Sequence, residues 1–259
     1  MNQPKSMQIE HWFAFADKWI PRKKEKIASG EGKQATYTSL ALIHASLART
    51  KFLNGDPIDE VRAEFARAAR AILKSFTMAY DETDPNYQGK KADLSCNSET
   101  IAIRGFNYSL MAADFNLSAE LAKWFQTRPD DVKMDVEVNR YAHALKHALL
   151  GEHQQASVLL KTQREAYEAK PSKRNDYRKN YYTLSTALYG ILEKDEALFN
   201  EGLQLQVVFY QGDARGELKD TDEEFICDYA VALGNLGIKY GLKVTVAHDT
   251  LPKGLLIQA

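Results

Sequence analysis

Apolar residues recur along most of the chain at spacings of three and four, which is the pattern of helices that bury one face. The clearest run places its apolar residues on a single helical face: Phe225, Tyr229, Ala232, Leu233 and Leu236. Thr221 and Glu224 come directly before this run. They are three residues apart, which is the spacing of a capping box at the start of a helix. We therefore predict a helix that begins at Thr221.

The same pattern predicts several further helices. One begins at Asp56-Pro57, because aspartate can cap a helix and proline fits its first turn. Its apolar stripe consists of Val61, Phe65, Ala68, Ala69, Ile72, Leu73 and Phe76. Similar stripes occupy six other segments: residues 40–53, 101–115, 141–150, 158–167, 181–192 and 198–209.

Short polar turns separate successive stripes, near Gly55, Asn116, Gly151 and Lys194. Each turn joins the apolar end of one helix to the start of another, as in antiparallel helical hairpins. The turns are 61, 35 and 43 residues apart, which is too unequal for a regular repeat. The predicted fold is all-α: an irregular, tetratricopeptide-like array of antiparallel helical hairpins.

Three stretches interrupt the helical pattern. Residues 81–95 predict a long connection, and residues 127–131 predict a turn. Residues 243–246 alternate in polarity and predict a short extended segment, followed by a tail that contains Pro252. Because no linker rich in Pro, Gly or Ser divides the chain, we expect one domain over residues 1–259.

The charge balance and the cysteines limit the classes of protein. Thirty-four basic and 35 acidic residues give a net charge of −1, without the positive field of non-specific nucleic-acid binders. No apolar stretch nears the ~20 residues of a membrane helix, and the first ten residues lack a signal pattern. Cys96 and Cys227 have no metal or redox spacing. We expect a cytoplasmic protein with free thiols that binds neither membrane nor nucleic acid.

Few residues suggest catalysis. His143 and His147 are four apart, so a helix places both on one face in reach of a common metal, but the glutamate of an HExxH motif is missing. Neither a Gly-x-Ser-x-Gly elbow nor a phosphate-binding loop occurs. We therefore expect no enzymatic activity, no metal and no cofactor. A metal-dependent helical hydrolase that uses these two histidines is an alternative.

The strongest charge pattern lies in residues 213–228, the acidic segment, where seven acidic and two basic residues give a net charge of −5. Six of these acids are candidate binding residues: Asp213, Glu217, Asp220, Asp222, Glu223 and Asp228. Such a strip can meet a basic cleft on a partner and orient it. Acids in the first turn of the predicted helix, Asp222 and Glu223, also interact favourably with its dipole. The first three acids therefore carry most of the functional prediction.

Two basic clusters have the opposite sign. Residues 22–26 carry a net charge of +3, and residues 170–179 carry +4. Tyr177, Tyr181 and Tyr182 accompany the second cluster, a mixture that suits single-stranded nucleic acid. Tyr181 shares a helical face with Leu184 and Leu188, which predicts a core position instead. We interpret the second cluster as a solvated helix start.

Three runs near the C-terminus carry a family resemblance: residues 228–237 (DYAVALGNLG), 240–244 (YGLKV) and 251–256 (LPKGLL). They resemble the end of Immunity protein 49 family members, and the turns near Gly151 and Lys194 fit the helical body of that family. The resemblance implies an all-α bacterial antitoxin that binds a cognate secreted toxin. The matching family positions are scaffold residues: Gly241, Pro252, Leu255 and Leu256.

We therefore expect an immunity protein that binds a cognate toxin acting in the cytosol and neutralises it by covering its active site. A nuclease or a nucleotide-consuming enzyme fits as the toxin, because the basic cleft of such an enzyme would meet the acidic segment. A tetratricopeptide-like adaptor that binds another protein is the alternative outside enzymology.

Overall fold

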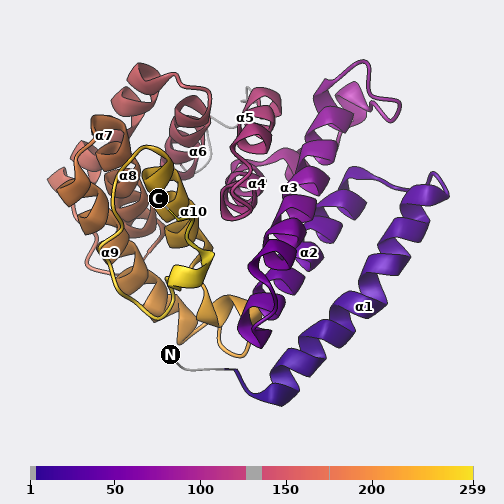
Figure 1. The fold of residues 1–259 in the computed structure, drawn as a ribbon. Coiled ribbons are helices and arrows are strands. Elements are labelled where there is room, and N and C mark those ends of the chain that lie inside the picture. The colour runs from indigo at the N-terminus through magenta and orange to yellow at the C-terminus, as the bar shows by residue number, and fades with distance from the viewer. Residues whose placement is uncertain (1–3, 127–135, 175, 259) are drawn as a thin grey trace. The chain divides into compact units, whose positions relative to one another are not determined.

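A computed structural model describes residues 4–126, 136–174 and 176–258 (Figure 1). These residues form ten α-helices and no strand, which confirms the all-α prediction. The helices group into two compact units, Met1–Phe125 (unit 1) and Gln126–Ala259 (unit 2). The single domain expected over residues 1–259 stays a prediction, and the turn expected at residues 127–131 lies outside the described residues.

Unit 1 contains five α-helices: α1 (Ser6–Ala28), α2 (Gln34–Asn54), α3 (Ile58–Tyr80), α4 (Glu99–Met111) and α5 (Phe115–Trp124). Consecutive helices pack against each other, so the predicted hairpins are present. Gly55 ends α2 with a φ of +85°, a left-handed conformation that glycine adopts without strain. The predicted long connection follows α3 and holds two short 3₁₀ turns, η1 (Gly89–Lys91) and η2 (Leu94–Asn97).

The core of unit 1 is built on the stripe that the sequence predicts for α3. Except for Leu73, which is half-buried, all members of that stripe are buried. Phe65 faces Tyr108 of α4 with ring centroids 6.2 Å apart, and Phe76 lies 6.2 Å from Phe125. Aromatic pairs at this spacing add to the stability gained from burial alone.

A carboxylate is buried at the interface between α2 and α3. Glu64 is 6% exposed, and one of its oxygens lies 2.6 Å from Nδ1 of the buried His44. The Arg67 guanidinium donates a hydrogen bond to the other oxygen. Burial raises the pKa of Glu64, but the hydrogen bond with His44 and the nearby positive charges outweigh burial, so the pKa is lowered. Glu64 therefore keeps its charge inside unit 1.

The described part of unit 2 forms five α-helices: α6 (Val136–Leu149), α7 (His153–Ala169), α8 (Tyr177–Glu193), α9 (Glu196–Ala214) and α10 (Asp228–Lys239). Helices α6 to α9 pack consecutively, and α10 packs on both α8 and α9. The predicted turns are confirmed at Gly151 and Lys194, where φ is +77° and +56°. Tyr181 is 6% exposed, so its predicted core position is confirmed as well.

Glycines bring α8 and α9 into backbone contact. A Cβ on Gly202 of α9 would overlap the backbone nitrogen of Ala187 in α8, and a Cβ on Gly190 would overlap the backbone of Phe199. The Phe199 ring in turn lies where a Cβ on Gly237 of α10 would be. Three helices of unit 2 therefore meet at positions that exclude any side chain larger than hydrogen.

The extended segment at residues 243–246 is held by side chains of α9, and no strand forms in the described residues. The N–H of Lys243 donates to the Glu196 carboxylate (2.9 Å), and the N–H of Thr245 donates to Oδ1 of Asn200 (2.7 Å). The Asn200 amide also donates to the carbonyl of Lys243 (2.9 Å). Thr245 is exposed and Val246 is buried. The alternation of polar and apolar residues therefore matches an alternation of exposed and buried side chains, although the segment pairs with no strand among the described residues.

The positions that carry the family resemblance are structural. Gly241 takes a φ of +86° in the turn after α10. Pro252 and Leu255 are buried, and Leu256 packs so closely on Gly234 that a Cβ there would come within 2.8 Å of its methyl group. The tail is thus part of the core of unit 2 (yellow in Figure 1).

The predicted start of the last helix at Thr221 is wrong. Residues Asp222–Phe225 form a 3₁₀ turn, η4, and α10 begins only at Asp228. The Thr221 hydroxyl donates to the carbonyl of Leu218 (2.6 Å), and the Glu224 carboxylate accepts from the N–H of Asp220 (2.7 Å). Both side chains of the supposed capping box therefore stabilise the preceding turn.

Two other boundaries differ from the sequence prediction. The turn expected at Asn116 lies at Ala113, whose φ is +57°, and Asn116 is inside α5. Asp114 caps α5 by accepting from the N–H of Leu117 (3.0 Å). The sequence prediction also missed α1, because this helix buries only Trp12 and Ala16 and so lacks a strong apolar stripe.

The close approach of α8 and α9 predicts a specific cost for a single methyl group. Gly202→Ala should lower the free energy of unfolding by at least about 1–3 kcal/mol, since the backbone of α8 must move to make room. Gly216→Ala is the matched control, because its Cβ would meet only ordinary contacts and should change stability by about 0.5 kcal/mol or less. Urea denaturation measures both, and equal stabilities would contradict the close contact.

The buried Glu64 carboxylate predicts a pH-dependent stability. Glu64→Gln should cost about 1.5–3 kcal/mol at pH 7, because hydrogen bonds to a charged group are lost. The pKa of Glu64 is lower in the folded chain than in the unfolded one, so its contribution is present at neutral pH and lost as the pH falls through the folded pKa. The difference from the wild type should therefore shrink below about pH 4.

Urea denaturation at several pH values tests this prediction. Glu60→Gln is the control, because it removes a 55% exposed carboxylate that pairs with Lys51 at the surface. This change should cost under about 1 kcal/mol at every pH. An effect of Glu64→Gln that stays constant down to acid pH would contradict a charged, buried Glu64.

Candidate functional site

The acidic segment joins three elements of unit 2. It starts in the last turn of α9, passes through a turn at residues 215–220 and η4, and ends at the first residue of α10. Glu217 and Asp220 are exposed and Asp213 is half-buried, so these three reach the surface as the prediction requires. Asp220 has a φ of +65°, a left-handed conformation that aspartate tolerates better than most residues.

Like charges are crowded at the start of the segment. The pKa of Asp213 is raised, first by partial burial and second by the negative charge of Glu217. Neither of these two carboxylates forms an ion pair within the described residues. The fold therefore holds two neighbouring carboxylates without a cation to neutralise them.

The remaining predicted acids are placed differently. Asp222 is only 8% exposed, and Glu223 is half-buried in η4, so neither lies in the first turn of an α-helix as expected. Asp228 is the first residue of α10, where the helix dipole favours a negative charge. Of the six predicted acids, Glu217 and Asp220 are exposed, Asp213, Glu223 and Asp228 are half-buried, and Asp222 is buried.

Tyr210 fixes the segment to α9. Its hydroxyl lies within hydrogen-bond distance of two backbone carbonyl oxygens, those of Glu223 (2.5 Å) and Ile226 (2.9 Å). Because Tyr210 is itself 8% exposed and belongs to a helix of the core, the chain on either side of Phe225 is tied to a rigid element. The acidic side chains are thus presented from an anchored turn.

The candidate metal ligands do not form a cluster. Nδ1 of His147 lies 2.5 Å from the Glu152 carboxylate, at the turn between α6 and α7. Nε2 of His153 lies 2.9 Å from the Tyr240 hydroxyl. Within the described residues, no three His, Cys, Asp or Glu side chains converge in a way that could hold a metal ion.

Both cysteines are free, as the sequence predicts, and the structure shows that both are also buried. Burial raises the pKa of Cys227 to about 12, and burial also raises the pKa of Cys96. Thiols with raised pKa values stay protonated at neutral pH and are poor nucleophiles.

The aromatic residues near the second basic cluster are engaged within unit 2. Tyr182 stacks on Tyr167 of α7 with centroids 4.4 Å apart, and Arg178 lies 6.0 Å from the Tyr167 ring. Nε of Arg178 is also 3.4 Å from the Glu137 carboxylate. Arg178 and Tyr182 are therefore used in joining α6, α7 and α8.

Unit 1 has a hollow that the sequence prediction missed, between α1 and α2. Its lining consists of Phe15, Trp19 and Lys23 of α1 with Ser39, Leu42 and Ile43 of α2. The cavity volume is about 390 Å³, and the Phe15 side chain is 45% exposed. Phe15, Trp19 and Lys23 follow one another at a spacing of four, so this face of α1 was visible in the sequence.

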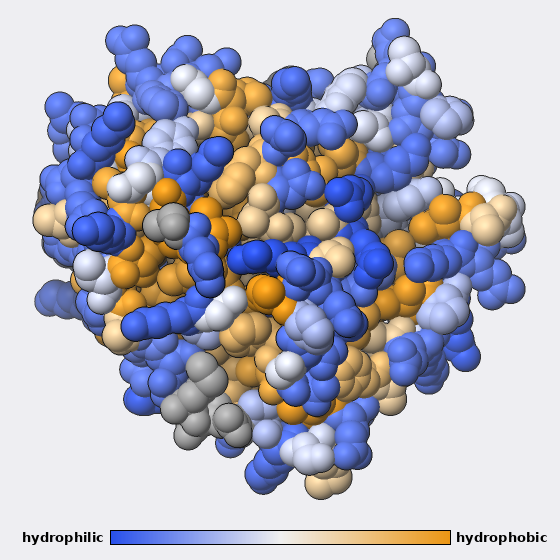
Figure 2. Space-filling view, in the orientation of Figure 1, coloured by the Kyte–Doolittle hydropathy of each residue, from blue (hydrophilic) through white to orange (hydrophobic). Residues whose placement is uncertain are grey.

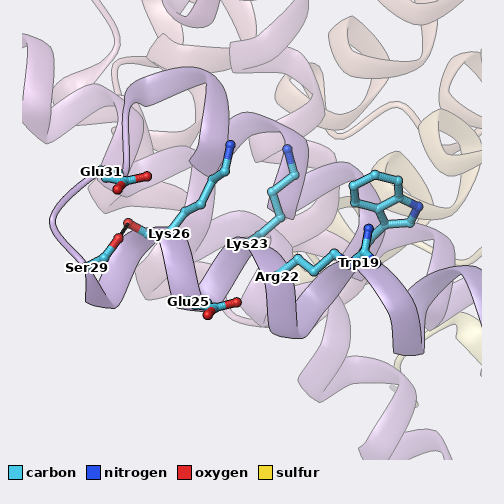
Figure 3. Close-up of a pocket in the computed structure, with 7 residues that line it drawn as sticks. All are labelled: Trp19, Arg22, Lys23, Glu25, Lys26, Ser29 and Glu31. Carbon is cyan, nitrogen blue, oxygen red and sulfur yellow. Dashed lines mark hydrogen bonds between the residues drawn. The ribbon is translucent and has the colours of Figure 1, made fainter.

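A second hollow of about 550 Å³ shares Trp19 and Lys23 with the first, and we call the two together the α1–α2 groove. Its other lining residues are Arg22, Glu25, Lys26, Ser29 and Glu31 (Figure 3). Figure 3 shows Lys23 and Lys26 extending to the same side of α1, while Arg22 reaches toward the Trp19 ring. The groove thus combines apolar side chains of α1 and α2 with three cations of α1, and two acidic residues, Glu25 and Glu31, also line it.

Comparisons with known proteins leave the function open. No family model, curated protein or solved structure matches the chain. Among the described helices, none combines the length and hydrophobicity that a bilayer-spanning segment requires.

The crowding of carboxylates in the acidic segment predicts a measurable coupling. Glu217→Gln should lower the pKa of Asp213 toward the ordinary aspartate value, because the nearby negative charge is removed. An NMR titration of the Asp213 carboxyl carbon measures the shift, and Glu201→Gln, on the exposed part of α9, is the control. Identical pKa values in the wild type and Glu217→Gln would show that the two groups do not interact.

Proposed function

We propose that the protein is a non-catalytic binding protein of the immunity type, which neutralises a cognate bacterial toxin by covering the toxin's active site. The acidic segment is the proposed contact surface, through Asp213, Glu217 and Asp220. The resemblance of the C-terminal part to the Immunity protein 49 family supports a toxin as the partner. A nuclease or a nucleotide-consuming enzyme has the basic cleft that these acids would fit.

The observation that carries the proposal is the unneutralised pair Asp213 and Glu217. The pKa of Asp213 is raised first by partial burial and second by the negative charge of Glu217, because neighbouring carboxylates repel each other. A cation supplied by a partner removes this repulsion and gains a favourable interaction at the same time. Tyr210 holds the segment in place beforehand, so little ordering is needed when the partner binds.

The fold suits this role. Stacked helical hairpins provide broad, rigid surfaces for other proteins, and inhibitors of this kind often bury ~1,600 Å² around a few anchor residues. The tetratricopeptide-like adaptor remains the alternative, since it would use the same type of surface. Protection from a toxin distinguishes the two functions, because an adaptor does not rescue cells.

Charge reversal tests the contact surface. Changing Asp213, Glu217 and Asp220 together to lysine should weaken binding to the toxin at least about tenfold and reduce its dependence on salt. The probe is the protein encoded by the neighbouring open reading frame, titrated against the full chain at several salt concentrations. The same triple variant should also fail to protect cells that express this protein.

A matched control separates a local contact from the change in net charge. Glu120, Glu165 and Glu201 are exposed and lie outside the acidic segment, so their joint change to lysine alters the net charge by the same amount. This control should bind nearly as well as the wild type. Equal affinity and equal salt dependence for the first triple variant and the wild type would remove the segment from the interface.

A further inference from the structure

We propose that the α1–α2 groove is a second binding surface, which takes an acidic segment of another protein through one large apolar side chain. The groove belongs to unit 1 and the acidic segment to unit 2, so this proposal does not depend on the proposed function. It rests on three observations: an exposed apolar floor, a cluster of cations beside it, and an aromatic ring held between them.

The floor of the groove exposes apolar surface to solvent. Leu42 of α2 is 37% exposed and Phe15 of α1 is 45% exposed, although both face the space between two packed helices. The Trp19 ring lies 6.3 Å from the Phe15 ring and completes this side of the hollow. Figure 2 shows that hydrophobic side chains reach the surface among hydrophilic ones on the side of the molecule that it draws. A large apolar side chain from a partner would remove this surface from water.

The cations beside the floor are not held in ion pairs among the described residues, although Glu25 and Glu31 line the same hollow. Five basic residues lie within nine positions of α1: Lys18, Arg22, Lys23, Lys24 and Lys26. None of these five forms an ion pair within the described residues. By contrast, α2 and α3 each contain a lysine that forms an ion pair, Lys51 with Glu60 and Lys74 with Asp84.

The helix dipole explains only the end of this cluster. It favours a cation in the last turn of α1, where Lys26 lies, and falls off beyond that turn. Lys18 and Arg22 instead flank the Trp19 ring, at 5.5 and 5.3 Å from its centroid. Cations at this distance are attracted to the ring face, so they orient Trp19 and remain available to an acidic ligand.

These features favour an acidic protein segment over a lipid surface or a nucleic acid. A bilayer meets the outermost face of a helix, whereas Leu42 and Ile43 lie on α2 at the base of the groove. Nucleotide bases bind single-strand proteins mainly by stacking on aromatic planes. The two rings of the groove suit this poorly, because Phe15 and Trp19 are tilted by 49° to each other and Lys18 and Arg22 lie over the Trp19 ring. A leucine or phenylalanine flanked by Glu or Asp satisfies both the apolar floor and the cationic rim.

Selection from a displayed random-peptide library tests the proposal, with the full chain as bait. We expect enrichment of peptides that combine acidic residues with one large apolar residue. Leu42→Glu and the double change Lys23→Glu with Lys26→Glu should each weaken a selected peptide at least about tenfold, measured by fluorescence anisotropy. Both changes are at residues that reach the surface, and thermal unfolding by circular dichroism checks that the variants fold.

Lys173→Glu with Lys253→Glu is the matched control, because both lysines are exposed and lie outside unit 1. This variant should bind the selected peptide like the wild type. The proposal would be overturned if the selected peptides were not enriched in acidic residues. It would also be overturned if the groove variants bound a selected peptide as tightly as the wild type does. Stronger groove-dependent binding to phosphatidylserine vesicles or to oligo-dT than to any selected peptide would also overturn it, by assigning the groove to lipid or nucleic acid.

Discussion

Helix α9 can organise unit 2 because residue 202 has no side chain. With hydrogen at this position the backbones of α8 and α9 touch at Ala187, and Phe199 then reaches α10 at Gly237. The same helix also binds the C-terminal segment through Glu196 and Asn200. One close contact between two helices thus fixes the elements that surround them.

The position of the acidic segment also depends on α9. Tyr210 lies two helical turns after Gly202 on α9, and its hydroxyl holds the chain that follows through the carbonyls of Glu223 and Ile226. Asp213 lies in the last turn of α9 and Glu217 in the turn that follows, so the helix and the Tyr210 contacts hold the two ends of the segment. A surface that stays charged and ordered before a partner arrives loses little entropy on binding.

Unit 1 contains charged groups in two kinds of environment. Inside, Glu64 keeps its charge because His44 and Arg67 hydrogen-bond to it, which offsets the cost of burial. On α1, the cations stay in solvent and are not held in ion pairs among the described residues, next to apolar side chains that α2 does not cover. The first arrangement stabilises the fold, and the second leaves interactions for another molecule to make.

The sequence by itself determined the elements whose stability is local. Periodic apolar stripes predicted most of the helices, and glycine predicted the turns at Gly55 and Gly151. The sequence prediction was wrong where a side chain had two possible hydrogen-bond partners. Thr221 and Glu224 have the spacing of a capping box, but the tertiary contact of Tyr210 with the chain after Glu223 favours a turn there.

Which side chains are exposed at the surface was decided by the tertiary structure. The sequence placed seven acids in one segment, but only folding buried Asp222 and left Glu217 exposed. It also showed Phe15, Trp19 and Lys23 at helical spacing, without showing that α2 would leave a hollow beside them. Spacing along a chain specifies which side chains share a face of one helix, whereas exposure depends on what a second helix covers.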